Sequence, residues 1–314
     1  MTASLALHDG RAGNARQALA LAQALDPGAK EWTLEPQSPW RRFAPLLLPG
    51  ATRAFGSAFT AYLRLPPPLV IGCGRQAALA TRLLRQRGSL AVQVLDPRID
   101  ARHWDAVVVP EHDALRGSNV ITTLGSLHPV DDDFLLRAIA GFPELALLPT
   151  PHTVLLVGGP SRHAPLEDAA FAALLAQLSA HAKAEGGSFS AIASRRTPPA
   201  WRQAITALPT ELPGLRWCDS SDGANPYAGL LASADRLICT PDSVNMLSEA
   251  AATHAPVFVW SADSVHGRPR TFIDTLLERG RIHPLDDTLA PFSAPPLRET
   301  MRVAELLRTR LQLP

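Results

Sequence analysis

Short runs of hydrophobic residues recur along this chain, and most are followed by a loop and a segment with helical spacing of its apolar positions. Continuous apolar runs that alternate with helices are typical of strands in a parallel sheet covered on both faces. In the N-terminal half the pattern predicts helices at 15–25 and 76–85. It predicts strands at 4–7, 69–71, 91–95, 106–109 and 120–123.

A second series of the same kind follows a proline-rich stretch at 143–151, which is a candidate connector between domains. Another proline-rich joint at 291–296 precedes a last amphipathic helix at 297–311. Further helices are predicted at 166–185 and 225–232, and strands at 153–157, 188–193, 215–218, 236–239 and 256–259. The fold class is therefore α/β, with Rossmann-like domains at 1–147 and 152–290 and a C-terminal segment at 291–314.

The composition narrows the classes of function. With 314 residues, 46% of them apolar and 19% charged, the chain can bury two ordinary cores. A net charge of +1 without a basic run argues against a nucleic-acid partner. No apolar run approaches a membrane span, and the start lacks the basic region of a signal peptide. Three cysteines without a CxxC pair suggest neither disulfides nor zinc, so we expect a cytoplasmic protein.

The segment 234–259 carries the strongest candidate chemistry. After the strand at 236–239, Thr240-Pro241-Asp242 forms a loop, and Ser243 is placed to cap the next helix. The free N–H groups of such a junction stabilise an anion, and Glu249, about two turns into the helix, could reach a ribose diol. We expect its carboxylate to face an open cleft without a buried partner. The layout resembles the donor-nucleotide motif of glycosyltransferases with the GT-B fold. An ordinary βαβ crossover is the alternative.

Loops along the whole chain resemble one family. In order, they read DGRAGNARQAL, IGCGR, LDPRID, VVVPEHD, TTLGSLH, VGGPSRH, SRRTP, NPY and TPDSVNMLSEAAA. Together they are similar to the bacterial branch of the mitochondrial-fission "elongated mitochondria" family. The resemblance implies a GT-B-like fold, in which two Rossmann-like domains with parallel sheets face a central cleft. The N-terminal domain would be the acceptor side, the C-terminal domain would bind the nucleotide sugar, and the C-terminal helix would cross back to the first domain.

The resemblance is incomplete in two places. The first loop of the family usually reads Gly-His, whereas this chain has Gly13-Asn14, and an asparagine cannot act as a base near neutral pH. The family usually has a glycine before the proline-containing strand after the donor helix, where this chain has Ala255. Plant members are associated with mitochondrial division through a dynamin-related partner, a role that does not transfer to this chain.

Phosphate-suited residues follow the strands of the second half. Gly158 and Gly159 would let the backbone approach a phosphate that Arg162 could clamp, although a plain turn is the alternative. Of the adjacent Arg195 and Arg196, we expect Arg195 to face the phosphate and its neighbour to be solvated or paired with an acid. Asn225 could contact the base or merely cap the helix after Pro226. The predicted nucleotide-binding residues are Gly158, Gly159, Ser161, Arg162, Ser194, Arg195, Asn225, Asp242, Ser243, Met246 and Glu249.

The first half holds the groups able to move a proton. An attacking acceptor hydroxyl needs a base, and the catalytic candidates are His112, Glu111 and Asp9. His112 lies between two carboxylates that could orient it, or that could simply cap a turn. The acceptor-side loops are predicted to contribute Gly10, Gly13, Asn14, Gly74 and Arg75, and Asp96 could pair with Arg98 across the cleft.

We expect neither a metal nor a cofactor. Asp131-Asp132-Asp133 has the D-x-D spacing of metal-dependent glycosyltransferases, but the run directly precedes a helix predicted to begin at Phe134. Carboxylates at that position complement the positive end of the helix dipole.

The leading hypothesis is a metal-independent glycosyltransferase that binds a nucleoside diphosphate sugar and acts on an unknown acceptor. A sugar-nucleotide epimerase on the same fold is one alternative. A non-catalytic GT-B-like scaffold, or a membrane-associated interaction protein, is another. The apolar stretch with Trp40, Phe43 and 46–48 could dock a membrane-bound acceptor, which would place the protein at the inner face of the membrane, or could be core. The sequence leaves these readings open, and the oligomeric state unknown.

Overall fold

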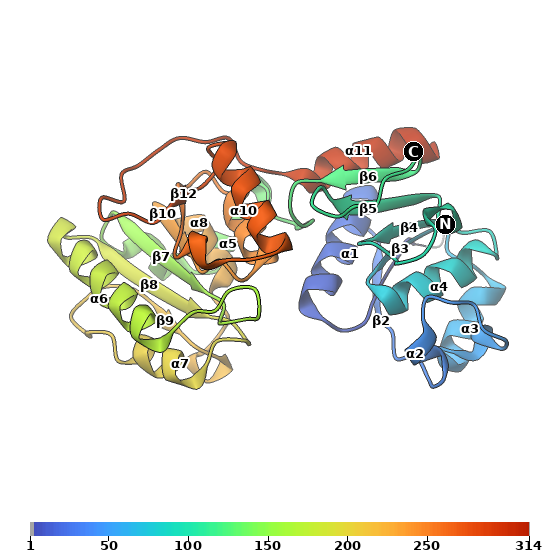
Figure 1. Cartoon of the computed structure of the whole chain (residues 1–314), viewed down its shortest axis with the longest axis horizontal. Helices are drawn as coiled ribbons and strands as arrows, with labels where there is room; N and C mark the ends of the chain where they lie inside the picture. The colour runs from blue at the N-terminus through green and yellow to red at the C-terminus, as the bar shows by residue number, and fades with distance from the viewer. Residues whose placement is uncertain (1–2, 314) are drawn as a thin grey trace. The chain divides into compact units, whose positions relative to one another are not determined.

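The computed structural model describes residues 3–313. The chain forms two compact units (Figure 1). The first contains the chain up to Pro129 and again from Arg298, and the second contains Val130–Leu297. Each unit has its own six-stranded sheet, and every strand pairs in parallel with its neighbours. Two Rossmann-like α/β domains, as predicted, are confirmed.

The sheet of the first unit has the order β2-β1-β3-β4-β5-β6. Its inner strands are almost wholly buried, which explains their continuous apolar sequences, whereas the edge strand β2 is largely exposed and polar. The strands are β1 (Leu5–His8), β2 (Lys30–Thr33), β3 (Leu69–Cys73), β4 (Leu90–Val94), β5 (Ala106–Pro110) and β6 (Val120–Thr123).

Helices cover both faces of this sheet. One buried cluster joins α3 and α4 to the strands, and the other joins α1 and α11. The helix α11 follows the second unit in sequence but packs here, since Val303, Ala304 and Leu307 are fully buried beside Leu21 of α1. The helices are α1 (Ala12–Leu25), α2 (Trp40–Phe43), α3 (Gly56–Arg64), α4 (Arg75–Arg85) and α11 (Glu299–Leu311).

The sheet of the second unit has the order β12-β11-β10-β7-β8-β9. Its central strands β7, β8 and β10 are buried along their whole length. The strands are β7 (His152–Val157), β8 (Ser188–Ala193), β9 (Arg216–Trp217), β10 (Arg236–Cys239), β11 (Val257–Val259) and β12 (His283–Pro284). The helices are α5 (Asp132–Ala140), α6 (Asp168–Glu185), α7 (Pro199–Thr206), α8 (Tyr227–Ser233), α9 (Val244–Ala251) and α10 (Arg268–Glu278).

The chain passes between the units twice, first well before the proline-rich stretch at 143–151 and then directly after the one at 291–296. The first crossing follows Pro129, and α5 and the short 3₁₀ helix Pro143–Leu147 pack on α8 in the second unit. A Cβ at Gly229 of α8 would come within 2.8 Å of the Phe142 ring, so this packing is close. The second crossing follows Leu297, whose N–H donates to the carbonyl of Ala251. Among the described residues no helix is both long enough and apolar enough to span a membrane.

Candidate functional site

The order of the second sheet creates a point where successive strands diverge. From β7 the chain continues to β8 on one side, and later returns to β10 on the other. In open parallel sheets, ligands bind at the carboxyl edge beside such a switch point. The loops after β7, β8 and β10 are therefore the natural location of a binding site in this unit, and they hold most of the predicted nucleotide-binding residues.

These three loops are hydrogen-bonded to one another through Gly158. The N–H of Gly158 donates to Oγ1 of Thr240 at 2.7 Å, which links the loop after β7 to the loop after β10. Its carbonyl accepts from Oγ1 of Thr197 at 2.6 Å, which links it to the loop after β8. Thr240 in turn donates to Oδ1 of Asp242 at 2.8 Å. Neither Thr197 nor Thr240 was a predicted site residue, because a threonine in the loop after a strand carries no distinctive signal.

The two glycines of this site are required by the packing of neighbouring loops. A Cβ at Gly158 would lie 2.1 Å from Oδ1 of Asp242, and one at Gly159 would lie 2.5 Å from the carbonyl oxygen of Arg196. Real Cβ atoms do not approach other atoms so closely. The sequence predicted that these glycines let the backbone approach a phosphate. In the structure the atoms that come close to them belong to the neighbouring loops.

A buried carboxylate lies at the centre of the site. The Asp242 side chain has no solvent exposure, and its Oδ2 is 2.6 Å from Nη2 of Arg196. Arg196 therefore supplies the counter-charge, which agrees with the expectation that one arginine of the pair binds an acid. Arg195, which was expected to face the phosphate, is exposed in the same loop. Arg196 thus neutralises the carboxylate of Asp242, which would otherwise repel a phosphate beside it.

The helix α9 begins as the sequence predicted. Oγ of Ser243 accepts the N–H of Met246 at 3.4 Å, so the N-cap is confirmed. Glu249, in contrast, was expected to face an open cleft without a buried partner, and this expectation is wrong. Only 2% of the residue is exposed, and its carboxylate accepts a 2.6 Å hydrogen bond from the hydroxyl of Tyr227, the first residue of α8.

The other predicted nucleotide-binding residues have local partners. Oγ of Ser161 accepts N–H groups two and three residues further on, and Nε of Arg162 donates to His163 at 2.9 Å. Oγ of Ser194 donates to the carbonyl of Gly158 at 3.3 Å. Oδ1 of Asn225 accepts the N–H of Tyr227 at 2.9 Å, so its side chain binds the start of α8.

The first unit has a similar switch point, between β1 and β3. Asp9 follows β1, and its Oδ1 accepts from Nδ2 of Asn14 at 2.9 Å. A Cβ at Gly74, after β3, would lie 2.6 Å from the same Nδ2. The structure thus brings Asp9, Asn14 and Gly74 together. Gly13 and Asn14 lie in the first turn of α1, not in the glycine-containing turn that the sequence predicted, because this helix begins at Ala12.

Two further acceptor-side candidates lie beside this group. Gly10 has a positive φ of 79°, which a glycine adopts without strain. Arg75 is the first residue of α4 and donates to the carbonyl of Arg42 at 3.3 Å.

The other catalytic candidates belong to a different place on the first sheet. Glu111 and His112 follow β5, and β3 and β4 lie between β5 and β1. At a strand spacing of about 4.8 Å, roughly 14 Å separates β5 from β1. The structure therefore does not place Asp9 beside these two residues. Two hydrogen bonds hold their loop. The N–H of Glu111 donates to the carbonyl of Thr123, and Nη2 of Arg116 donates to the carbonyl of Glu111.

The aspartate run at 131–133 and the pair of Asp96 with Arg98 have local explanations. Oδ1 of Asp131 accepts the N–H of Phe134 at 2.7 Å and caps α5, which begins at Asp132. Within residues 3–313 no group of histidine, cysteine and carboxylate side chains is arranged to hold a metal ion. The pair of Arg98 with Asp96, at 3.1 Å, lies within a single loop and crosses no cleft.

The apolar stretch around α2 is partly core and partly surface. Trp40 packs on the buried cluster of the first unit, and its Nε1 donates to the carbonyl of Pro49. Phe43 and Leu46 remain 45% and 47% exposed. This segment therefore stays a candidate docking surface as well as part of the core.

Comparisons with known proteins agree with this architecture. The model of the family described as Mitochondrial fission ELM1 matches residues 12–311. A relative from Arabidopsis thaliana, the mitochondrial fission protein ELM1, is 29% identical over 78% of this chain and 64% of its own length. An uncharacterized protein of Rickettsia prowazekii is 24% identical over 80% of this chain and 81% of its own. This chain thus spans less than two thirds of the length of the plant relative.

Solved structures with the same fold have different activities. The UDP-GlcNAc 2-epimerase of Methanocaldococcus jannaschii has a TM-score of 0.58 at 11% identity, covering 98% of this chain and 99% of that one. The spinosyn forosaminyltransferase SpnP has a TM-score of 0.51 at 14% identity, covering 100% and 95%. Both similarities establish that the fold is GT-B, and at these identities they say nothing about the activity of this chain.

Proposed function

The chain belongs to the Mitochondrial fission ELM1 family, and from that premise we propose that it binds a nucleoside diphosphate sugar and transfers the sugar without a metal ion. The observation that carries the proposal is the network around Gly158, in which the loops after β7, β8 and β10 meet at the switch point of the second sheet. A diphosphate at this place would meet the start of α9 and the cationic side chains of the adjoining loops. The acceptor is not specified.

In this proposal catalysis rests on positioning and on charge. The leaving diphosphate gains negative charge as the glycosidic bond breaks, and backbone N–H groups with Arg162, Arg195 or Arg196 stabilise that charge. Asp9 is the proposed base for the acceptor hydroxyl, since it is a carboxylate at a switch point and Asn14 orients it at 2.9 Å. Glu111 and His112 stay a second candidate pair, separate from Asp9.

Thermal unfolding in the presence of UDP, GDP, ADP and CMP sugars tests the binding step. A ligand at about a hundred times its dissociation constant should add about 2.7 kcal/mol to the free energy of unfolding. No response to any nucleotide would remove the proposal.

A matched pair of variants then locates the site. Arg195→Gln should weaken the binding of the ligand. It should leave the unliganded protein as stable as the parent, because Arg195 is exposed. Arg196→Gln should weaken the ligand and also lower the stability, since it leaves the carboxylate of Asp242 without its ion pair. Unchanged affinity in both variants would place the ligand elsewhere.

A sugar-nucleotide epimerase is the second candidate, and the fold of two epimerases solved with UDP-GlcNAc supports it, at TM-scores of 0.52 and 0.53. Incubation of the protein with the nucleotide sugar alone separates the two reactions. An epimerase returns an isomeric nucleotide sugar, whereas a transferase without acceptor releases only nucleotide and free sugar, slowly. Binding with neither product would favour the non-catalytic scaffold.

A further inference from the structure

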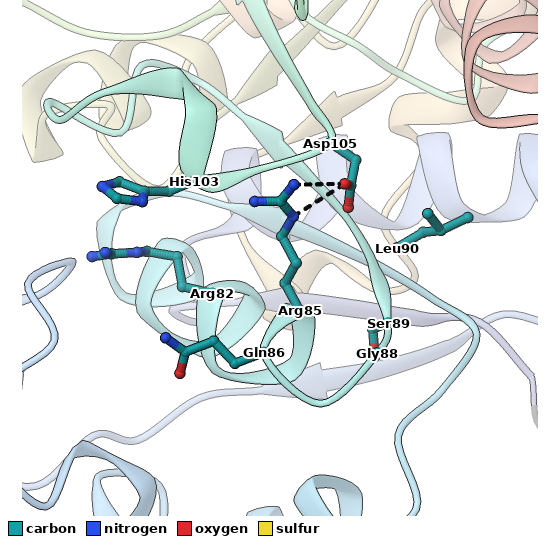
Figure 2. Close-up of a pocket in the computed structure, with 8 residues that line it drawn as sticks. All are labelled: Arg82, Arg85, Gln86, Gly88, Ser89, Leu90, His103 and Asp105. Atoms are coloured by element: carbon teal, nitrogen blue, oxygen red, sulfur yellow. Dashed lines mark hydrogen bonds and ion pairs between the residues drawn. The ribbon is translucent and has the colours of Figure 1, made fainter.

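The first unit contains a pocket at the edge of its sheet where β4 and β5 begin. The pocket has a volume of about 380 Å³ and is lined by the end of α4, the turn into β4 and the turn into β5 (Figure 2). Strands β4 and β5 begin there, at Leu90 and Ala106, so the pocket lies at the amino ends of the strands. Asp9 and Gly74 lie at the carboxyl ends. The proposed transferase chemistry makes no use of this pocket.

A buried cation lines the pocket without a counter-charge. Arg82 is only 9% exposed, yet within residues 3–313 it forms no ion pair with a carboxylate. Its Nη1 donates to the carbonyl of Pro45 at 2.6 Å, and within the same range Nε and Nη2 donate no hydrogen bond. Burial lowers the pKa of the guanidinium. The guanidinium also lies over the ring of Trp104, 5.9 Å from the ring centroid, which offsets part of the cost of burying it. The rest of that cost would fall if an anion compensated the charge.

The neighbouring charges leave the pocket positive. Nε and Nη2 of Arg85 both bind Oδ1 of Asp105, at 3.0 and 2.9 Å, so these two residues neutralise each other. Figure 2 shows the side chain of His103 on the same side of the pocket as that of Arg82, away from the pair of Arg85 with Asp105. Burial, and then the charge of Arg82, lower the pKa of His103. Both effects would be opposed by a bound anion.

We propose that this pocket binds a phosphate monoester, with Arg82 and His103 as the groups that hold the phosphate. The fork of a guanidinium donates two parallel hydrogen bonds to a phosphate, and Arg82 has two nitrogens free for this geometry. A dianion also stabilises the protonated form of His103, which gives a second charged donor. Arg82 lies in the last turn of α4, where its charge also complements the negative end of the helix dipole, but that role engages neither Nε nor Nη2 of the guanidinium. A soluble phosphorylated metabolite and a lipid headgroup share this chemistry.

Calorimetric titration of the full chain with glycerol 3-phosphate tests the proposal. The parent should bind, and Arg82→Gln should weaken the affinity by about tenfold or more, as the loss of charged hydrogen bonds does. Arg87→Gln is the matched control, since Arg87 is exposed, follows the same helix and lies outside the pocket. The same loss of charge there should change the affinity less than about twofold, because solvent and salt screen exposed charges.

A second variant and a second measurement keep the test independent of the stability of Arg82→Gln. Gln86 is an exposed pocket residue, so the Gln86→Glu variant should fold normally. Its added carboxylate should repel the phosphate and weaken the binding of glycerol 3-phosphate. In the parent, NMR titration of His103 should give a higher pKa with the ligand than without it, because the dianion favours the imidazolium.

Vesicles distinguish the two sources of phosphate. Phosphatidylcholine vesicles with and without phosphatidic acid are compared for binding of the parent, Arg82→Gln and Gln86→Glu. Arg82-dependent binding to phosphatidic acid supports a lipid headgroup, and Arg82-dependent binding to glycerol 3-phosphate alone supports a soluble ligand. No binding of either probe, or binding that both pocket variants leave unchanged, overturns the proposal.

Discussion

The carboxylate of Glu249 has two candidate roles at the scale of a single residue. It is buried and accepts a hydrogen bond from the hydroxyl of Tyr227. Its position in α9 would also allow it to accept hydrogen bonds from a ribose diol. We expect Glu249→Ala to lower the free energy of unfolding by about 1–3 kcal/mol, because the phenol loses its acceptor. If the residue also holds the ribose, the same variant should lose about tenfold or more in nucleotide affinity. Denaturant unfolding and calorimetric binding measure the two effects separately.

Tyr227→Phe is the matched control, since it removes the same hydrogen bond and retains the carboxylate. It should reproduce the loss of stability and leave most of the affinity. Equal losses of affinity in the two variants would mean that Glu249 acts only through Tyr227. Parental affinity in Glu249→Ala would contradict a ribose contact.

At the scale of the element, α9 is held at both ends by side chains. Ser243 caps its start, and the buried Arg281 binds its end. Nε of Arg281 donates to the carbonyl of Ala251 and Nη2 to that of Thr253, both at 2.8 Å. Burial lowers the pKa of Arg281 to about 10, so it remains charged at neutral pH. Nη1 of Arg281 also donates a longer hydrogen bond, of 3.4 Å, to the carbonyl of Ala255, the position at which the family usually has a glycine.

Arg281→Met should therefore destabilise the protein more than Ser243→Ala. The first removes the Arg281 donor from the buried carbonyls of Thr253 and Ala255 and should cost about 3 kcal/mol, whereas loss of an N-cap costs about 1 kcal/mol. Denaturant unfolding of the two variants gives the comparison. A loss in Arg281→Met no larger than that in Ser243→Ala would show that the carbonyls find other partners.

At the scale of the whole molecule, we expect stability to depend on pH through a buried histidine. His152 is the first residue of β7, and only 2% of it is exposed. Its Nε2 lies 2.8 Å from Oγ of Ser190. Burial lowers its pKa below the usual 6.5, although the carbonyl of Ser233 and the charge of Asp235 oppose the shift. The unfolded chain thus takes up a proton at a higher pH than the folded one. The contribution to stability is present above about pH 6.5 and is lost as the pH falls below it.

Urea unfolding at about pH 7.5 and pH 5.5 measures this dependence. The parent should be less stable at the lower pH, and His152→Gln should show a smaller difference between the two conditions. His266 is exposed, so His266→Gln should behave as the parent does. His103, whose pKa burial also lowers, adds to the same dependence from the first unit. Equal stability of the parent at both values would rule out a shifted histidine.

The sequence by itself determined the features that depend on neighbours along the chain. Apolar runs located the buried strands, as at 188–193 and 236–239, because a strand covered on both faces needs a continuous apolar sequence. The cap by Ser243 followed from the spacing of a hydroxyl and a helix start. The exposed edge strand β2, with the sequence KEWT, has no such pattern and escaped detection.

The tertiary structure decided which distant residues meet. The order of the strands placed Asp9 beside Gly74 and away from Glu111, and no local pattern encodes that order. Likewise, the packing of α8 on the rest of the second unit places the hydroxyl of Tyr227 beside Glu249. The conformation of the loop after β8 places Arg196, and not Arg195, in an ion pair with Asp242. The burial of Arg82 was equally invisible in the sequence. Hydrophobic periodicity reports the environment of each segment, whereas partners across a sheet are fixed only when the segments pack.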